Sequence, residues 1–243
     1  MALGAWNLPP AMHRLTYLVG TMAVLSGGLT VRYGASWPLL ARLALGYVAL
    51  VAVVVATAAA TRWTAYAAKG MFFKNPRTGL IPWCWVLLLL PYHVCCRVVC
   101  WFYRNSSGEN VFDMIAPRLY LGGWPLNASM LPSDNCAIID CTNELLRYVD
   151  VPAYLPLLMD MAVQWALGQQ AKGRDVFCHC THGHGRSAVT AAAILMGMGG
   201  ARTADDALAK TLKARPGVKP NYRQKDMLRE WAAAAHLPPK REE

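Results

Sequence analysis

The sequence predicts an α-helical membrane region followed by an α/β domain in which helices flank a central, mostly parallel sheet. Two observations separate these parts. The first 108 residues contain no Asp or Glu and hold three uncharged apolar stretches. After them, short β-branched runs alternate with helical patterns, as in a sheet covered by helices. We therefore expect a membrane region at 1–103, a linker at 104–111, an α/β domain at 112–238 and a tail at 239–243.

The first two apolar stretches, 15–31 and 43–61, are each long enough to cross a hydrocarbon core of about 30 Å. The loop from Arg62 to Arg77 carries basic residues and no acids, so the positive-inside rule places it in the cytoplasm. The two spans then form a hairpin, which predicts an integral membrane protein with a cytosolic second half. A signal peptide or organelle transit peptide is the alternative, and the second long apolar run argues against both.

The third apolar stretch, 80–101, is interrupted by Pro82, Pro91, His93 and Arg97. Its unbroken apolar run is short, so we expect an embedded or re-entrant segment rather than a plain span. Nearly all of the net charge of +10 belongs to the acid-free half of the chain. This pattern suits basic residues beside a lipid bilayer and argues against a nucleic-acid partner.

The second half is expected to contain four strands and four helices. The strand segments are β-branched or aromatic and end at turn-forming residues. One helix begins with a Thr203 cap and two acids in its first turn, and the last helix begins at Asn221 after Pro220. The strands are expected at 118–123, 136–141, 147–151 and 175–179, and the helices at 157–171, 187–198, 203–214 and 221–235.

The stretch DVFCHCTHGHGRSAV, residues 175–189, combines a strand, a loop with two glycines, and a helix that begins near Arg186. Backbone N–H groups and the positive end of the helix converge in such a loop, where an anion can bind. Cys180 opens the loop, and a thiol in these surroundings should have a lowered pKa. An anion cradle, a nucleophile and a guanidinium together predict phosphoryl transfer through a cysteinyl-phosphate, with no metal or other cofactor.

The segment HCTHGHGRS, residues 179–187, matches H-C-x-x-G-x-x-R-[ST], the signature of the protein tyrosine phosphatase superfamily. IAPRLYLGGWP and ARPGVKPNYRQKDMLREW resemble the opening strand and the closing helical stretch of dual-specificity phosphatases. The apolar first half, together with LGGWP and IIDCTNEL, is similar to membrane-anchored members from plants and algae. The resemblance spans 112–235 and implies the cysteine-dependent phosphatase fold and hydrolysis of a phosphoprotein or a phospholipid head group.

The resemblance also implies roles for the residues of the loop. Cys180 is the nucleophile, and Arg186 binds the phosphate and the transition state. Ser187 assists the sulfur as a leaving group, and His179 orients the loop and helps to set the pKa of the cysteine. The backbone N–H groups that bind the phosphate oxygens belong to Thr181, His182, Gly183, His184, Gly185 and Arg186.

The general acid is the point at which this sequence departs from the family. Family members carry an Asp on a mobile loop some thirty residues before the cysteine, whereas YVDVPAYLPLLMDM has no Asp directly after Pro152. Asp150 lies 30 residues before Cys180 and is our candidate acid, with Asp160 as a second candidate. Three interpretations stay open: Asp150 acts from an altered loop, the protein is an impaired pseudophosphatase acting as a membrane-bound phosphate-binding adaptor, or the sequence lost an exon.

A zinc site is the rival interpretation of Cys178, His179, Cys180, His182 and His184. Zinc ligands usually come as two separated pairs, and the second half of the chain has no second pair of that kind. The phosphate-binding loop is therefore favoured, and no metal is expected.

The remaining polar residues near the motif are expected to have modest roles. The side chains of His182 and His184 are predicted to lie exposed at the rim of the loop. His184 falls where phosphoinositide-directed relatives carry a lysine, which indicates a multiply anionic substrate. Cys178, Cys141 and Asp140 are interpreted as structural, with a protective disulfide to Cys180 as the alternative for Cys141.

Overall fold

The chain forms two compact units in the computed structural model. One unit comprises Met1–Phe73 and Ile81–Arg97, and the other comprises Lys74–Leu80 and Val98–Glu243. The structure describes residues 10–33, 36–60, 74–75, 78–142, 145–156 and 159–234.

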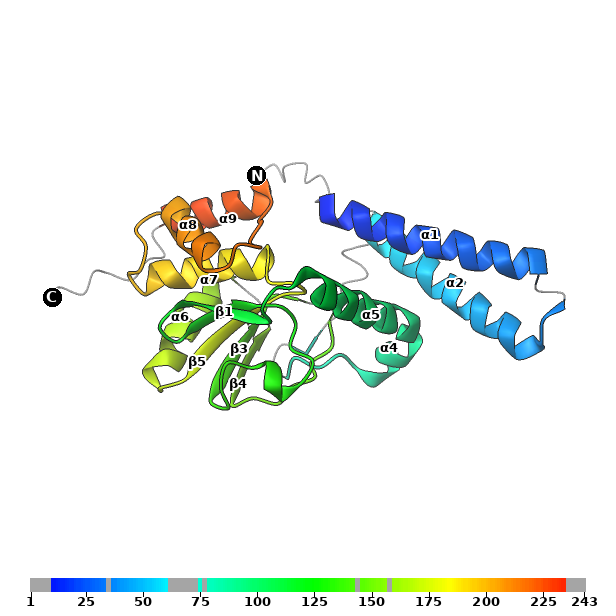
Figure 1. Ribbon diagram of the computed structural model, residues 1–243, viewed down its shortest axis with the longest axis horizontal. Coiled ribbons are helices and arrows are strands. Elements are labelled where there is room, and N and C mark those ends of the chain that lie inside the picture. The colour runs from blue at the N-terminus through cyan, green and yellow to red at the C-terminus, as the bar shows by residue number, and fades with distance from the viewer. Residues whose placement is uncertain are drawn as a thin grey trace. The chain divides into compact units, whose positions relative to one another are not determined.

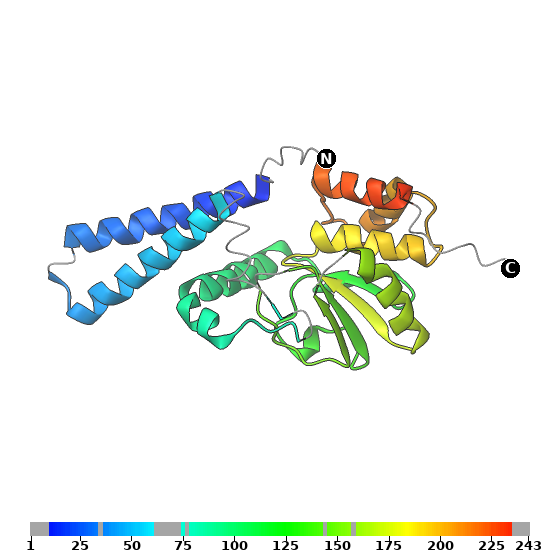
Figure 2. The same cartoon turned by 180° about the vertical axis from the view of Figure 1, so that it is seen from behind.

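The first unit contains two long helices, α1 (Pro10–Tyr33) and α2 (Leu39–Ala60), which lie side by side (Figures 1 and 2). They extend beyond the predicted spans 15–31 and 43–61 by a few residues, mostly at their N-terminal ends. Within the described residues, one helix is long and apolar enough to cross a membrane. Its apolar window is Leu39–Thr57, with a mean hydropathy of 2.4.

The third apolar stretch forms two helices, α4 (Trp83–Leu88) and α5 (Leu90–Ser107). Pro82 directly precedes α4 and Pro91 lies in the first turn of α5, positions that suit a residue without an N–H group. The hydroxyl of Tyr47 donates to the carbonyls of Leu87 (2.6 Å) and Leu88 (3.0 Å). It thereby satisfies carbonyl groups at the break between the two helices.

The predicted linker at 104–111 is in part helical, because α5 continues to Ser107. The helix ends at Gly108, whose φ of 64° is the left-handed conformation that glycine adopts at a helix C-terminus. The irregular part of the connection to the sheet is therefore short.

The second unit is built on a five-stranded sheet in the order β1-β2-β5-β3-β4. β1 is antiparallel to β2, and the other neighbours are parallel. This arrangement confirms the predicted α/β domain with a central, mostly parallel sheet. The strands are β1 (Phe112–Ala116), β2 (Leu119–Gly122), β3 (Cys136–Asp140), β4 (Ala153–Pro156) and β5 (Asp175–His179).

The predicted strand at 147–151 is wrong, because β4 begins only at Ala153. Val149 and Val151 instead pack on one face of the sheet, against Ile138 and Phe177 among others. The apolar alternation of this segment is real, but it reflects a chain that crosses over the sheet and not a strand within it.

Four helices of the second unit follow the predicted order. Thr203 caps α8 by accepting a hydrogen bond from the N–H of Asp206 (3.1 Å), and Asn221 and Gln224 form a capping box at the start of α9. The helices are α6 (Met159–Ala171), α7 (Arg186–Gly197), α8 (Ala204–Ala214) and α9 (Tyr222–Ala233), and a short 3-10 helix, η2, spans Ala128–Met130.

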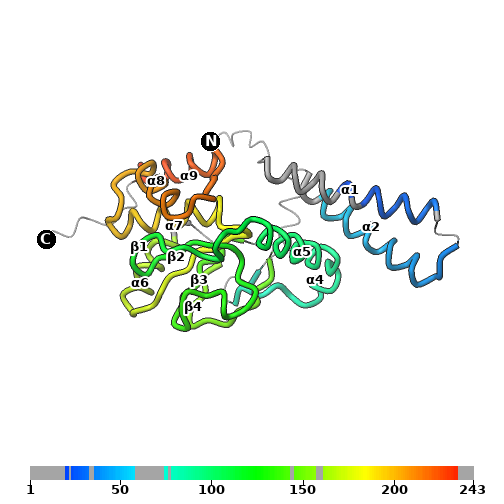
Figure 3. The backbone as a smooth tube through the Cα atoms, in the orientation of Figure 1, coloured from blue at the N-terminus to red at the C-terminus, as the bar shows by residue number. Residues whose placement is uncertain are grey.

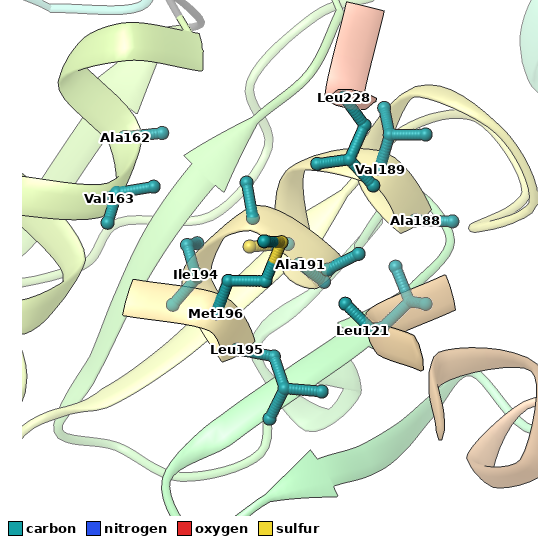
Figure 4. Packing of buried hydrophobic residues seen from close by; sticks show 14 of the residues in the cluster. Leu121, Ala162, Val163, Ala188, Val189, Ala191, Ile194, Leu195, Met196 and Leu228 are labelled. Atoms are coloured by element: carbon teal, nitrogen blue, oxygen red, sulfur yellow. The ribbon is translucent and has the colours of Figure 1, made fainter. Parts of the chain in front are cut away.

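The core surrounds α7, in which every residue after Arg186 is buried. Figure 4 shows the side chains of this helix among Val163 of α6, Leu121 of β2 and Leu228 of α9. α8 and α9 pack on α7 on the side away from the sheet (Figure 3). Helices therefore cover one face of the sheet and fix the helix that follows the candidate loop.

Candidate active site

The predicted phosphate-binding loop connects the central strand β5 to α7. β5 ends at His179, the loop spans 180–185, and α7 begins at Arg186. The backbone N–H of Trp124 donates to the carbonyl of Thr181 (3.1 Å), which ties the loop to the chain after β2. The carboxyl end of a parallel strand and the amino end of a helix therefore meet here, a position that favours an anion.

Two glycines of the loop are required by close packing. Gly183 has a φ of 84°, and a Cβ atom on it would lie 2.6 Å from the carbonyl carbon of Gly122. A Cβ atom on Gly185 would lie 2.8 Å from the side-chain oxygen of Gln224. The loop is thus held between the end of β2 and the start of α9, which leaves its backbone little freedom.

Cys180 lies at the base of this loop with 6% of its surface exposed. The hydroxyl of Ser187 donates to its Sγ at 3.1 Å, and the N–H of Gly183 does so at 3.3 Å. Burial alone would raise the pKa of the thiol, but the charge of Arg186 and these hydrogen bonds outweigh it, so the pKa of Cys180 is lowered from its ordinary value. The geometry therefore favours a thiolate.

A buried ion pair lies next to the loop. Asp140 ends β3 with 1% of its surface exposed, and its Oδ1 is 3.7 Å from Nε2 of His179. The Nζ of Lys74 and the hydroxyl of Tyr154 donate to Oδ2. Thr142 donates to Oδ1 through its N–H (2.8 Å) and its hydroxyl (2.6 Å).

These contacts determine the pKa shifts of Asp140 and His179 next to the loop. Burial opposes ionisation of Asp140, but His179, Lys74 and Thr142 together lower the pKa of its carboxyl. Burial lowers the pKa of His179, an effect that Asp140 offsets only in part. The arrangement is therefore an ion pair between Lys74 and Asp140 beside a histidine whose pKa is lowered by burial.

The prediction that His182 and His184 lie exposed at the rim is wrong, because both side chains are half-buried. The ring of Tyr103 lies 4.2 Å from that of His182, and Nε2 of His184 is 2.6 Å from a carboxylate oxygen of Glu109. Burial and the neighbouring His184 lower the pKa of His182 to about 4. These side chains join the loop to the end of α5 instead of pointing into solvent.

The candidate acid Asp150 lies on the irregular segment that precedes β4. Its carboxylate is fully exposed and pairs with Arg147 (2.7 Å), and exposed pairs hold a side chain only weakly. The same segment approaches the loop, since the ring of Tyr148 lies 5.3 Å from that of Trp124. No described contact joins Asp150 to Cys180, and the side chain of Asp160 lies outside the described residues.

The structure describes no group of three or more His, Cys, Asp or Glu side chains arranged to hold a metal ion. The eight cysteines are all free thiols. Cys178 is fully buried in β5, and Sγ of the buried Cys141 lies 3.6 Å from the hydroxyl of Thr190. Both have the packed surroundings that we expect of structural cysteines.

Sequence reasoning missed the residues that hold the loop from other parts of the chain. A buried Asp at the end of an apolar strand indicates that a partner is needed, but no spacing identifies it. Arg215 is also buried, and it donates to the carbonyl of His182 (3.1 Å) and to the carboxylate of Asp113 (2.5 Å). The missed residues are Lys74, Tyr103, Glu109, Tyr154 and Arg215.

No family model matches the chain, and no curated protein sequence matches it. Solved structures that resemble it include the human tyrosine phosphatase-like serine/threonine/tyrosine-interacting protein. The two are 23% identical with a TM-score of 0.46, and the match covers 52% of this chain and 98% of that one. PTPMT1 in complex with PI(5)P is 22% identical with a TM-score of 0.42, covering 51% and 96%. DUSP15 is 19% identical with a TM-score of 0.44, covering 52% and 90%.

Proposed function

We propose that this chain is a membrane-anchored phosphatase that hydrolyses phosphomonoesters through a cysteinyl-phosphate intermediate. The surroundings of Cys180 carry the proposal. A buried thiol of lowered pKa lies between a strand end and a helix start, with Ser187 donating to its sulfur. Arg186 stands at the first position of that helix, where its guanidinium can bind two phosphate oxygens at once.

The reaction has two steps. The Sγ of Cys180 attacks phosphorus, the bond to the leaving oxygen breaks, and an acid gives that oxygen a proton. Water then attacks phosphorus, the sulfur–phosphorus bond breaks, and inorganic phosphate leaves as the thiolate forms again. Arg186 and the N–H groups of 181–186 bind the phosphoryl oxygens, His179 orients the loop, and Ser187 donates to the departing sulfur.

The proposed substrates are phosphoproteins or phospholipid head groups, and no nucleic acid is among the proposed partners. The acid-free first 108 residues and the apolar helix at Leu39–Thr57 support an integral membrane protein whose second unit, the proposed catalytic unit, lies in the cytosol. The membrane-anchored dual-specificity phosphatases of plants and algae are the relatives that this proposal implies.

A trapped intermediate tests the covalent mechanism. We expect the full-length protein, in lipid nanodiscs under reducing conditions, to release inorganic phosphate from an aryl phosphate with an initial burst. Acid quenching during the burst should leave a phosphoryl group on Cys180, located by mass spectrometry of the tryptic peptide 175–186. Turnover without a phosphoryl group on Cys180 would contradict the mechanism.

An impaired phosphate-binding adaptor at a membrane is the second candidate function. The observation that favours it is the sequence between Asp150 and Asp160, which contains no Asp or Glu. In this alternative the loop binds a phosphorylated partner without releasing phosphate. Phosphate binding without turnover of any phosphomonoester would support it over the enzyme.

Comparing substrates with poor and good leaving groups shows whether a general acid acts in this protein. If Asp150 is the general acid, Asp150→Asn should lower kcat/KM for a phosphoserine peptide by roughly 10²-fold and leave an activated aryl phosphate nearly unchanged. The reason is that a serine alkoxide leaves poorly without a proton. Asp226→Asn, which neutralises another exposed acid, is the matched control.

Two outcomes would change the assignment. Equal rates for the wild type and Asp150→Asn on both substrates would remove Asp150 as the acid. A wild type that cleaves only the aryl phosphate would show that no acid acts, which favours the impaired protein.

A further inference from the structure

Lys74 is buried within the catalytic unit although it precedes the predicted α/β domain. Its side chain is 2% exposed, and its Nζ donates to Asp140 and to the hydroxyl of Thr142 (3.2 Å). A buried ammonium is costly unless a carboxylate and further acceptors surround it, as they do here. The contacts with Asp140 and Thr142 therefore offset the cost of burying Lys74.

The chain after Lys74 is packed against the same network. Lys74–Leu80 belongs to the catalytic unit although the segments on both sides of it belong to the other unit. A Cβ atom on Gly79 would lie 2.1 Å from the ring of Tyr154, and Arg147 donates to the carbonyl of Thr78 (2.8 Å). Packing thus sets the position of the Lys74 ammonium.

One positive charge is needed to balance the buried carboxylate of Asp140. His179 is the other described base beside it, but burial and the charge of Lys74 both lower the pKa of His179. Lys74 is the closer of the two, since its Nζ donates directly to Oδ2 of Asp140, whereas Nε2 of His179 lies 3.7 Å from Oδ1.

We propose that Lys74 is a positioning residue of the phosphate-binding loop, which balances the buried carboxylate of Asp140 and so keeps the surroundings of Cys180 favourable to a thiolate. The inference rests on the proposed function only in taking Cys180 as the nucleophile. The titratable and charged groups nearby are Arg186 and Cys141 around Cys180, and Lys74, His179, Tyr154 and Arg147 around Asp140.

The test measures how fast iodoacetamide alkylates Cys180 as a function of pH in the full-length protein. Mass spectrometry of the tryptic peptide 175–186 separates Cys180 from Cys178. We expect Lys74→Met to slow alkylation about fivefold in the range where wild-type Cys180 is still partly protonated, because the unbalanced carboxylate opposes the thiolate. Asp140→Asn should accelerate it there, because the ammonium is then unbalanced.

The double variant Lys74→Met/Asp140→Asn should come back to within about twofold of the wild type, because it removes both charges. Lys210→Met is the matched control, since that lysine is exposed and pairs with Asp206 on the surface of α8. Opposite changes in the alkylation rate that cancel in the double variant indicate a charge effect. Loss of packing would not produce this pattern.

The proposal is overturned if both single variants shift the rate in the same direction, if Lys74→Met behaves like Lys210→Met, or if the double variant does not recover. Thermal unfolding monitors whether each variant folds. If a single variant does not fold, the double variant decides: recovery supports the proposal, and a changed rate or an unfolded protein overturns it. Alkylation needs no turnover. A wild-type protein without phosphatase activity would therefore contradict the proposed function, but the role of Lys74 could still be tested.

Discussion

Cys180→Ser should reduce turnover of an aryl phosphate by roughly 10⁴-fold or more, because a serine hydroxyl in the same place stays protonated and is a poor nucleophile. Inorganic phosphate should still bind, since the backbone of the loop and Arg186 are kept. The two measurements are steady-state phosphate release and calorimetric titration with inorganic phosphate, both on the full-length protein.

The matched control for this variant is Cys84→Ser, which changes an exposed thiol in the other unit. It should leave both phosphate release and phosphate binding unchanged. Turnover of Cys180→Ser within about tenfold of the wild type would show that the nucleophile is another group, because loss of a nucleophile costs far more than that.

Arg186→Lys should lower kcat/KM for the same substrate by roughly 10³-fold, the scale seen when a transition-state arginine is lost in phosphoryl transfer. The lysine keeps the charge, but it cannot donate two parallel hydrogen bonds to the phosphoryl group. It also gives up the fixed direction of a guanidinium at the first position of α7.

The same substitution at an exposed arginine separates chemistry from folding. Arg229→Lys affects only surface pairs with Asp205 and Asp226 on α8 and α9, so kcat/KM should not change. The inhibition constant of inorganic phosphate should rise for Arg186→Lys alone. An Arg186→Lys protein with wild-type kcat/KM would remove this arginine from the proposed mechanism.

The sequence predicts those parts of the fold that depend on residues close together in the chain. The cap at Thr203 acts within one helical turn, and it is present. The segment at 147–151 alternates like a strand, but alternation describes any extended chain with one face against a core. Tertiary packing placed β4 further along, at Ala153.

In the candidate site, too, the sequence predicts the local part but not the contacts with distant residues. The loop from His179 to Ser187 is continuous in the chain, so a motif can describe it. Lys74 pairs with Asp140 and Glu109 pairs with His184 of the loop. The two residues come from the segments that we assigned to the membrane region and the linker, because the sequence there is distinguished mainly by its charge and hydropathy. Contacts between residues so far apart leave no trace in local spacing, and only the folded chain brings them together.

The packing of Lys74–Leu80 makes the second unit discontinuous in sequence. A fragment that starts at residue 112, the boundary that composition suggests, lacks Lys74 and leaves the buried carboxylate of Asp140 without its cation. During synthesis Lys74 also leaves the ribosome before β3 exists, so its site is complete only when the strands have formed. The unit that contains Cys180 therefore includes a segment that lies upstream of its sheet in the sequence.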